Sequence, residues 1–93
     1  MPKKQQLVPK MKGEENWTLT QQLLKIQEEL DETLQASGEN YIEEIGDLLH
    51  AFWVFIRILQ REGIDAYTAV ERVVDKNRAR GYYDEPTETS QTA

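Results

Sequence analysis

Cysteine is absent from this chain of 93 residues, and His50 is its single histidine. The absence of cysteine excludes disulfide frameworks and thiolate metal sites. One histidine cannot form a histidine cluster. Any metal ion that the protein binds is therefore expected to be held by oxygen ligands.

Long hydrophobic runs are also absent. The longest apolar stretch, Leu48 to Leu59, is interrupted by His50 and Arg57 and is shorter than the roughly 20 residues that span a membrane. No apolar run of signal-peptide length follows the basic N-terminus. We therefore expect a cytoplasmic protein that does not enter a membrane. A chain of this length buries only a modest part of its surface, so a homo-oligomer is expected to complete the core.

Basic residues are missing from the middle of the chain, which has a net charge of -6. Between Lys25 and Arg57 there is no lysine or arginine, but there are eight acids: Glu28, Glu29, Asp31, Glu32, Glu39, Glu43, Glu44 and Asp47. Basic residues gather instead near the N-terminus and in KNRARG, residues 76–81. This distribution argues against a nucleic-acid surface and favours a metal ion together with a phosphate-containing ligand.

The hydrophobic pattern predicts an all-α protein without strands. Apolar residues recur at steps of three and four, and capping and breaking residues place helices at about residues 18–36, 39–60 and 65–81. Residues 1–16 are interpreted as a basic N-terminal tail, 17–81 as the helical domain and 82–93 as a polar C-terminal tail. The short connections predict an antiparallel helical bundle, completed by oligomerisation.

The second predicted helix has two apolar stripes. The broad one contains Tyr41, Ile45, Leu48, Leu49, Phe52, Phe55, Ile56 and Leu59. The narrower one continues the line of Glu44 and Asp47 with Ala51, Val54 and Ile58, so these two acids are expected to face inward. Glu43 falls on the polar side and is interpreted as solvated.

On the first predicted helix, Glu29 borders the apolar face of Ile26 and Leu30, and Glu32 lies one step further round. A short turn would bring these two acids towards Glu44 and Asp47. Four carboxylates in a partly desolvated space are costly unless a cation lies among them, and oxygen ligands favour Mg²⁺, with Mn²⁺ as a second choice. An ordinary solvated acidic face is the other interpretation, and the helix faces alone do not decide between the two.

The order of the acids resembles a known family. Glu28, Glu29 and Glu32 in LLKIQEELDETL are followed by Glu44 and Asp47 in IEEIGDLLHAF and later by GIDAYTAVERVVDKNRARG. This EExxE and ExxD pattern, over residues 23–81, is similar to that of the MazG-like all-α nucleoside triphosphate pyrophosphohydrolases. The short gap between Glu32 and Glu44, and Val73 where many relatives carry lysine, are departures from it.

The resemblance implies hydrolysis of a canonical or damaged (deoxy)nucleoside triphosphate to the monophosphate and pyrophosphate with Mg²⁺, in nucleotide-pool control or housecleaning. It implies metal binding by Glu29, Glu32, Glu44 and Asp47, and we expect Glu29 or Glu32 to accept the proton of the attacking water. Phosphate contacts are expected from the basic end of the third helix, at Lys76, Asn77, Arg78 and Arg80. Trp17 is the candidate for stacking on the base, with a packing role as the alternative.

Two other functions remain open at this point. One is a non-catalytic helical dimerisation or protein-interaction module that uses the acids only as scaffold. The other is a carboxylate-bridged di-iron bundle, which normally adds Glu-x-x-His pairs and is disfavoured by the single histidine.

Overall fold

The computed structural model describes residues 7–86, and this part of the chain is helical without strands. It contains a short 3-10 helix, η1 (Glu14–Asn16), and three α-helices, α1 (Leu19–Gln35), α2 (Asn40–Arg61) and α3 (Ala66–Ala79). The three predicted helices are therefore confirmed. The predicted tails fall partly outside the described residues, at 1–6 and 87–93.

The helix ends follow from local chemistry. Thr18 caps α1 in a capping box, because its hydroxyl accepts from the Gln21 N–H while the Gln21 side chain accepts from the Thr18 N–H. Asp65 caps α3 by accepting from the Tyr67 N–H. Gly63, at φ 82°, occupies the left-handed conformation that ends α2 and begins the connection to α3.

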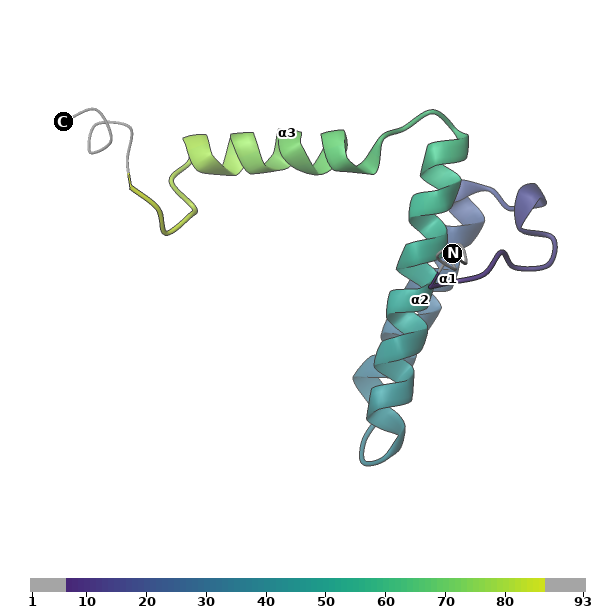
Figure 1. Cartoon of the computed structure of the whole chain (residues 1–93). Helices are drawn as coiled ribbons and strands as arrows, with labels where there is room; N and C mark the ends of the chain where they lie inside the picture. The colour runs from purple at the N-terminus through teal and green to yellow at the C-terminus, as the bar shows by residue number, and fades with distance from the viewer. Residues whose placement is uncertain (1–6, 87–93) are drawn as a thin grey trace, which may run out of the picture.

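Helices α1 and α2 form an antiparallel hairpin (Figure 1). The buried residues of α2 are Ala51, Val54 and Ile58, and the last two are only 1% exposed. This is the narrower of the two predicted apolar stripes, and it continues the line of Glu44 and Asp47. The inward orientation is confirmed for Ala51, Val54 and Ile58, and Glu44 is partly buried, whereas Asp47 is exposed, so the expectation that it faces inward is wrong for a single chain.

Two side-chain hydrogen bonds join the helices of the hairpin. The amide of Gln22 donates to the Ala51 carbonyl oxygen at 2.8 Å. The Thr33 hydroxyl donates across the hairpin to the Glu44 carbonyl oxygen at 3.1 Å, and its proton is shared with the Glu29 carbonyl oxygen of its own helix at 2.7 Å. Because Thr33 links the backbones of two of the predicted metal ligands, it fixes the separation of α1 and α2 at the acids.

Helix α3 leaves the hairpin and contacts α2 alone (Figure 1). The radius of gyration is 18.0 Å, whereas about 12 Å is expected for a compact chain of this length. The predicted antiparallel packing therefore holds for α1 and α2, and a single chain does not fold α3 back into a bundle. No helix within residues 7–86 is long and apolar enough to cross a bilayer.

The broad apolar face of α2 is largely exposed in the single chain. Leu49, Phe52, Trp53 and Ile56 are exposed, Trp53 to 46%, and so are Leu23, Leu30 and Leu34 on α1. Leu23, Leu30 and Leu34 recur with Ile26 at three- and four-residue steps, which predicts one buried face of this helix, and within one chain that prediction is wrong for the three leucines. Monomeric proteins rarely expose a contiguous apolar area of this kind without using it.

Candidate metal centre

Three of the four predicted metal ligands converge where α1 and α2 face each other. Glu29 from α1 and Glu44 and Asp47 from α2 each offer a carboxylate oxygen, and these oxygens lie within 4.8 Å of one another. We call these three residues the acid cluster. The spacing of Glu44 and Asp47 by three residues puts both on one side of α2, and Glu29 meets them from across the hairpin.

Burial makes this cluster unlike an ordinary acidic surface. Glu29 is only 7% exposed, and Glu44 is partly buried. Within residues 7–86, Glu29 Oε1 and Glu44 Oε2 have no hydrogen-bond partner and are inaccessible to solvent, whereas Asp47 is exposed. A buried carboxylate oxygen without a partner loses its hydration and gains nothing in return. A divalent cation among these carboxylates would remove this penalty, and an all-oxygen donor set is chemically suited to a hard cation.

Lys25 supplies the positive charge nearest to the cluster. Its ammonium lies 3.0 Å from Glu29 Oε2 and 2.9 Å from Glu28 Oε1, one turn along α1. The hydrogen bonds to Glu28 and Glu29 raise the pKa of Lys25 above its ordinary value, so the side chain stays charged. This confirms the intrahelical pairing expected of a lysine four residues before a glutamate. Among the described residues, the pairing of Lys25 with Glu28 and Glu29 Oε2 leaves Glu29 Oε1, Glu44 and Asp47 without a cation.

Glu32, the fourth predicted ligand, lies at the exposed edge of the site. It shares a second group with Glu28 and Glu29, whose carboxylate oxygens also come within 4.8 Å of one another. The negative charge of Glu29 raises the pKa of Glu32, and the charges of Glu44 and Glu28 act in the same direction. Glu29 therefore belongs to both groups and connects the buried acids to the exposed ones.

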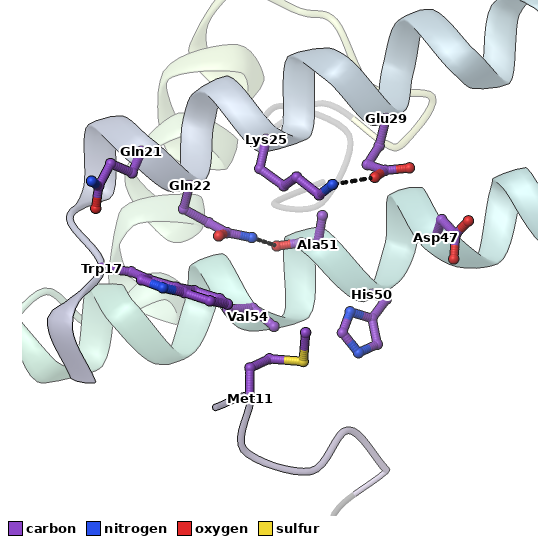
Figure 2. A pocket seen from close by; sticks show the side chains of 10 residues that line it. All are labelled: Met11, Trp17, Gln21, Gln22, Lys25, Glu29, Asp47, His50, Ala51 and Val54. Carbon is purple, nitrogen blue, oxygen red and sulfur yellow. Dashed lines mark hydrogen bonds and ion pairs between the residues drawn. The ribbon is translucent and has the colours of Figure 1, made fainter. Parts of the chain in front are cut away.

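A cavity of about 660 Å³ opens beside the acid cluster, within the usual range of small-molecule sites. Figure 2 shows Glu29 and Asp47 at one end and Trp17 and Gln22 at the other. Gln22 and Glu29 are seven residues apart on one face of α1, which corresponds to about 10 Å along the helix. The remaining lining residues are Met11, Gln21, Lys25, His50, Ala51 and Val54.

The basic residues predicted to bind phosphate are not brought to this cavity by their own chain. Lys76, Asn77 and Arg78 lie on α3 and Arg80 follows it, whereas no residue of α3 lines the cavity. Asn77 is partly buried, as the helix register predicted. Arg78 pairs with Glu85 and Asp75 and lies over the ring of Tyr83 at 5.7 Å. Trp17, in contrast, lines the cavity.

Three features of the site were missed by the sequence analysis. Gln22 is buried in register with Ile26 and Glu29, a position that the helical spacing could have indicated. His50, which follows Asp47 by three residues and is given no role by the sequence, is partly buried and lines the cavity. Residues 7–16, predicted to be the end of a tail, are folded against α2 and bring Met11 to the cavity. Nothing in the local sequence indicates this last contact.

Comparisons with models of known protein families, with curated proteins and with solved structures found no match for this chain. The chemistry of the site is therefore argued from its own residues.

Proposed function

We propose that the protein is a Mg²⁺-dependent nucleoside triphosphate pyrophosphohydrolase of the MazG-like type, which converts a (deoxy)nucleoside triphosphate and water to the monophosphate and pyrophosphate. The observation that carries this proposal is the pair of buried, unpartnered oxygens, Glu29 Oε1 and Glu44 Oε2, beside Asp47 at the end of a ligand-sized cavity. A cytoplasmic role in nucleotide-pool control or housecleaning belongs to the same proposal.

Each part of the site has a role in this reaction. Glu29, Glu44 and Asp47 would hold the cation, and Glu32 would approach it from the exposed edge of the site. When bound, Mg²⁺ supplies charge neutralisation for the triphosphate and activates water. A carboxylate oxygen of Glu29 or Glu32 accepts the proton of the attacking water. Lys25 lines the cavity beside Glu29, where its ammonium can pair with a phosphate oxygen.

The length of the cavity fits an extended nucleotide. With the triphosphate at the acid cluster, the sugar would pass Lys25 and His50, and the base would reach Trp17 and Gln22 about 10 Å away. The indole of Trp17 offers the flat apolar surface on which any base can stack. In this placement Trp17 stacks on the base, as expected from the sequence. Selection between bases then depends on the polar groups around the indole.

The proposal is tested by incubating the protein with a panel of ribo- and deoxyribonucleoside triphosphates in Mg²⁺ and identifying the products by chromatography. We expect equal amounts of monophosphate and pyrophosphate from at least one nucleotide, and no reaction in excess chelator. Formation of a diphosphate and orthophosphate, or no turnover of any nucleotide by the folded protein, would contradict the proposal.

A homo-oligomer is part of the proposal. The exposed apolar side chains of α2, including Phe52, Trp53 and Ile56, and the radius of gyration of 18.0 Å both favour a second copy that covers this face. The basic end of α3 can contribute to a phosphate site only where another copy brings it to a cavity. A homodimer or a homotetramer could both cover the apolar face of α2 and bring the basic end of α3 to a cavity.

Trp53→Glu is expected to convert the assembly to smaller species, because it places a charge in the apolar contact. Light scattering after size-exclusion chromatography measures the mass. Thr20→Glu, which adds the same charge at an exposed position of α1, is the matched control and should leave the mass unchanged. A wild-type protein with the mass of one chain would contradict the oligomer.

The same apolar face favours a second candidate function, a non-catalytic dimerisation or protein-interaction module. In that case the acids would be scaffold only. The two candidates differ in what happens when a single acid of the cluster is neutralised, because only the enzyme depends on its charge.

A further inference from the structure

The segment of residues 7–17, here called the N-terminal strap, is part of the folded core. Val8 is buried against Val54 and Ile58 of α2, and Trp17 packs against the same cluster. The only helix in the strap is η1, of three residues. Several of its carbonyl groups accept hydrogen bonds from side chains of α2 instead.

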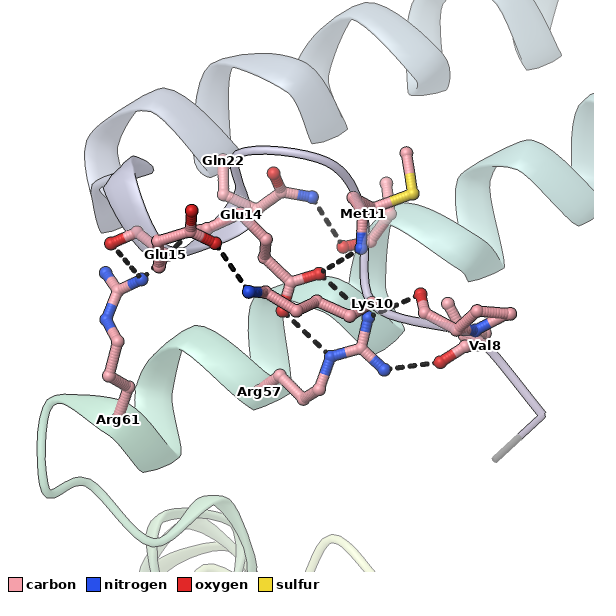
Figure 3. A network of polar contacts seen from close by, with 10 residues as sticks. Val8, Lys10, Met11, Glu14, Glu15, Gln22, Arg57 and Arg61 are labelled. Carbon is pink, nitrogen blue, oxygen red and sulfur yellow. Dashed lines mark hydrogen bonds and ion pairs between the residues drawn. The ribbon is translucent and has the colours of Figure 1, made fainter. Parts of the chain in front are cut away.

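Arg57 of α2 supplies several of these donors and holds the strap through Glu14 (Figure 3). Its guanidinium donates to both carboxylate oxygens of Glu14, each at 2.9 Å, in a bidentate pair. The same guanidinium donates to the carbonyl oxygens of Val8 and Pro9. Glu14 Oε1 also accepts from the Met11 N–H at 3.0 Å, which closes the turn before η1.

Arg61, one turn further along α2, continues this network. It donates to the carbonyl oxygens of Glu14 and Glu15, and also to that of Trp17. The two arginines thus hold the strap along its length, from Val8 to Trp17. Glu14 is buried, so a broken Arg57 pair would leave a carboxylate without compensation and favour release of the strap.

The strap carries two of the side chains that line the cavity, Met11 and Trp17. Trp17 lies at the end away from the acid cluster, near Gln22 and Val54, and Met11 lies between Val54 and His50 (Figure 2). Arg57 and Glu14 do not line the cavity themselves. Their effect on a ligand must therefore pass through the position of Met11 and Trp17.

We infer that the N-terminal strap is the wall of the site that binds the nucleobase, and that Arg57 is the positioning residue that keeps this wall in place through Glu14. The inference rests on the proposed function for the identity of the ligand. The strap supplies Trp17 at the base end and Met11 beside it, and the residues of the acid cluster all come from α1 and α2. Recognition of the base and binding of the triphosphate are therefore separable.

The position of the strap is measured with Trp17 as the only tryptophan, in a Trp53→Phe background. We expect Arg57→Gln to shift the Trp17 emission to longer wavelength and to increase its quenching by acrylamide, with helix content by circular dichroism unchanged. Lys12→Gln removes the same charge from an exposed side chain of the strap and should change neither signal. Unchanged Trp17 emission in Arg57→Gln would overturn the positioning role, whatever the enzyme does.

The base contact is measured by comparing a nucleoside triphosphate with inorganic tripolyphosphate, which has no base. Arg57→Gln is expected to raise KM for the best nucleotide by about tenfold to a hundredfold, the effect of losing one base stack, with a much smaller change in kcat. Inhibition by tripolyphosphate should be unchanged. Glu14→Gln is a milder change and should also raise KM for the nucleotide, by a smaller factor.

Equal weakening of nucleotide and tripolyphosphate binding would overturn the role of the strap as a base-specific wall. A wild-type protein that turns over no nucleotide would instead contradict the proposed function. In that case, a change in Trp17 emission on addition of a nucleotide would support the base contact. No change in emission with any nucleotide would overturn the base contact as well.

The pH dependence of the strap gives an independent readout. The hydrogen bond from Arg57 lowers the pKa of Glu14 below its ordinary value of 4.5, with further lowering by the Met11 N–H and the charge of Lys10, against the opposing effect of burial. The stabilisation is therefore complete above pH 4.5 and is lost as the pH falls through the lowered pKa. We expect Trp17 emission to shift below pH 4.5 and before helix content falls. Simultaneous loss of both signals would contradict separate release of the strap.

Discussion

Replacing Glu44 with glutamine is expected to reduce kcat/KM for nucleoside triphosphate hydrolysis by about a hundredfold to a thousandfold, or about 3 to 4 kcal/mol of transition-state stabilisation. The substitution keeps the shape of the side chain and removes the charge of a partly buried ligand whose Oε2 has no other partner. Activity is expected to fall because the remaining acids bind the cation less tightly and position it less well. Initial rates of pyrophosphate release measure the effect.

Glu43→Gln is the matched control for this experiment. Glu43 is the neighbouring residue, it is exposed, and it belongs to neither group of converging carboxylates. The control variant should retain wild-type kcat/KM within a factor of about two, as expected for a surface residue without a role. Equal loss of activity in Glu43→Gln and Glu44→Gln would show that net charge matters and the acid cluster does not. Activity unaffected by Glu44→Gln would exclude this residue as a ligand.

The second large effect is expected in stability, with opposite signs in the absence and presence of Mg²⁺. In chelator, Glu44→Gln should be as stable as the wild-type protein or more stable, because it removes a charge that lies close to Glu29 and Asp47. At a Mg²⁺ concentration 100 times its Kd, the wild-type protein should gain about 2.7 kcal/mol from binding. Glu44→Gln should lose most of this gain.

Thermal unfolding with and without Mg²⁺ measures both effects. A gain of this size in a domain of under 100 residues raises Tm by roughly 10 °C or more. Glu43→Gln again serves as the control and should respond to Mg²⁺ like the wild-type protein. A Glu44→Gln protein that is less stable than wild type in chelator and equally stabilised by Mg²⁺ would contradict a cation site at the acid cluster.

The parts of this structure that were predictable from sequence are those set by local chemistry. The capping box of Thr18, the cap of Asp65 and the glycine after α2 give helix ends that depend on a few neighbouring residues. The inward stripe of Glu44, Ala51 and Val54 follows from helical periodicity alone. Once the turn sets α1 and α2 antiparallel, the periodicity of the two helices brings Glu29 close to Glu44 and Asp47.

The rest depends on contacts between distant residues. Arg57 falls on the polar side of α2 in any helical projection, and only its bidentate pair with Glu14, 43 residues away, gives it a role. The direction of α3 is set by the connection after Gly63 and by the apolar surface that a single chain leaves exposed. Helical periodicity identifies an apolar face, but it does not indicate whether the same chain or another copy covers it.

The central claim is that Glu29, Glu44 and Asp47 hold the cation on which triphosphate hydrolysis depends. The most direct test is a crystal structure with Mn²⁺ and a non-hydrolysable nucleoside triphosphate analogue, with Mn²⁺ located by its anomalous scattering. The account predicts Mn²⁺ within 2.0 to 2.3 Å, roughly, of oxygens from these three residues, with the triphosphate on its open side and the base against Trp17. Mn²⁺ bound elsewhere, or a nucleotide outside the cavity between the acid cluster and Trp17, would contradict it.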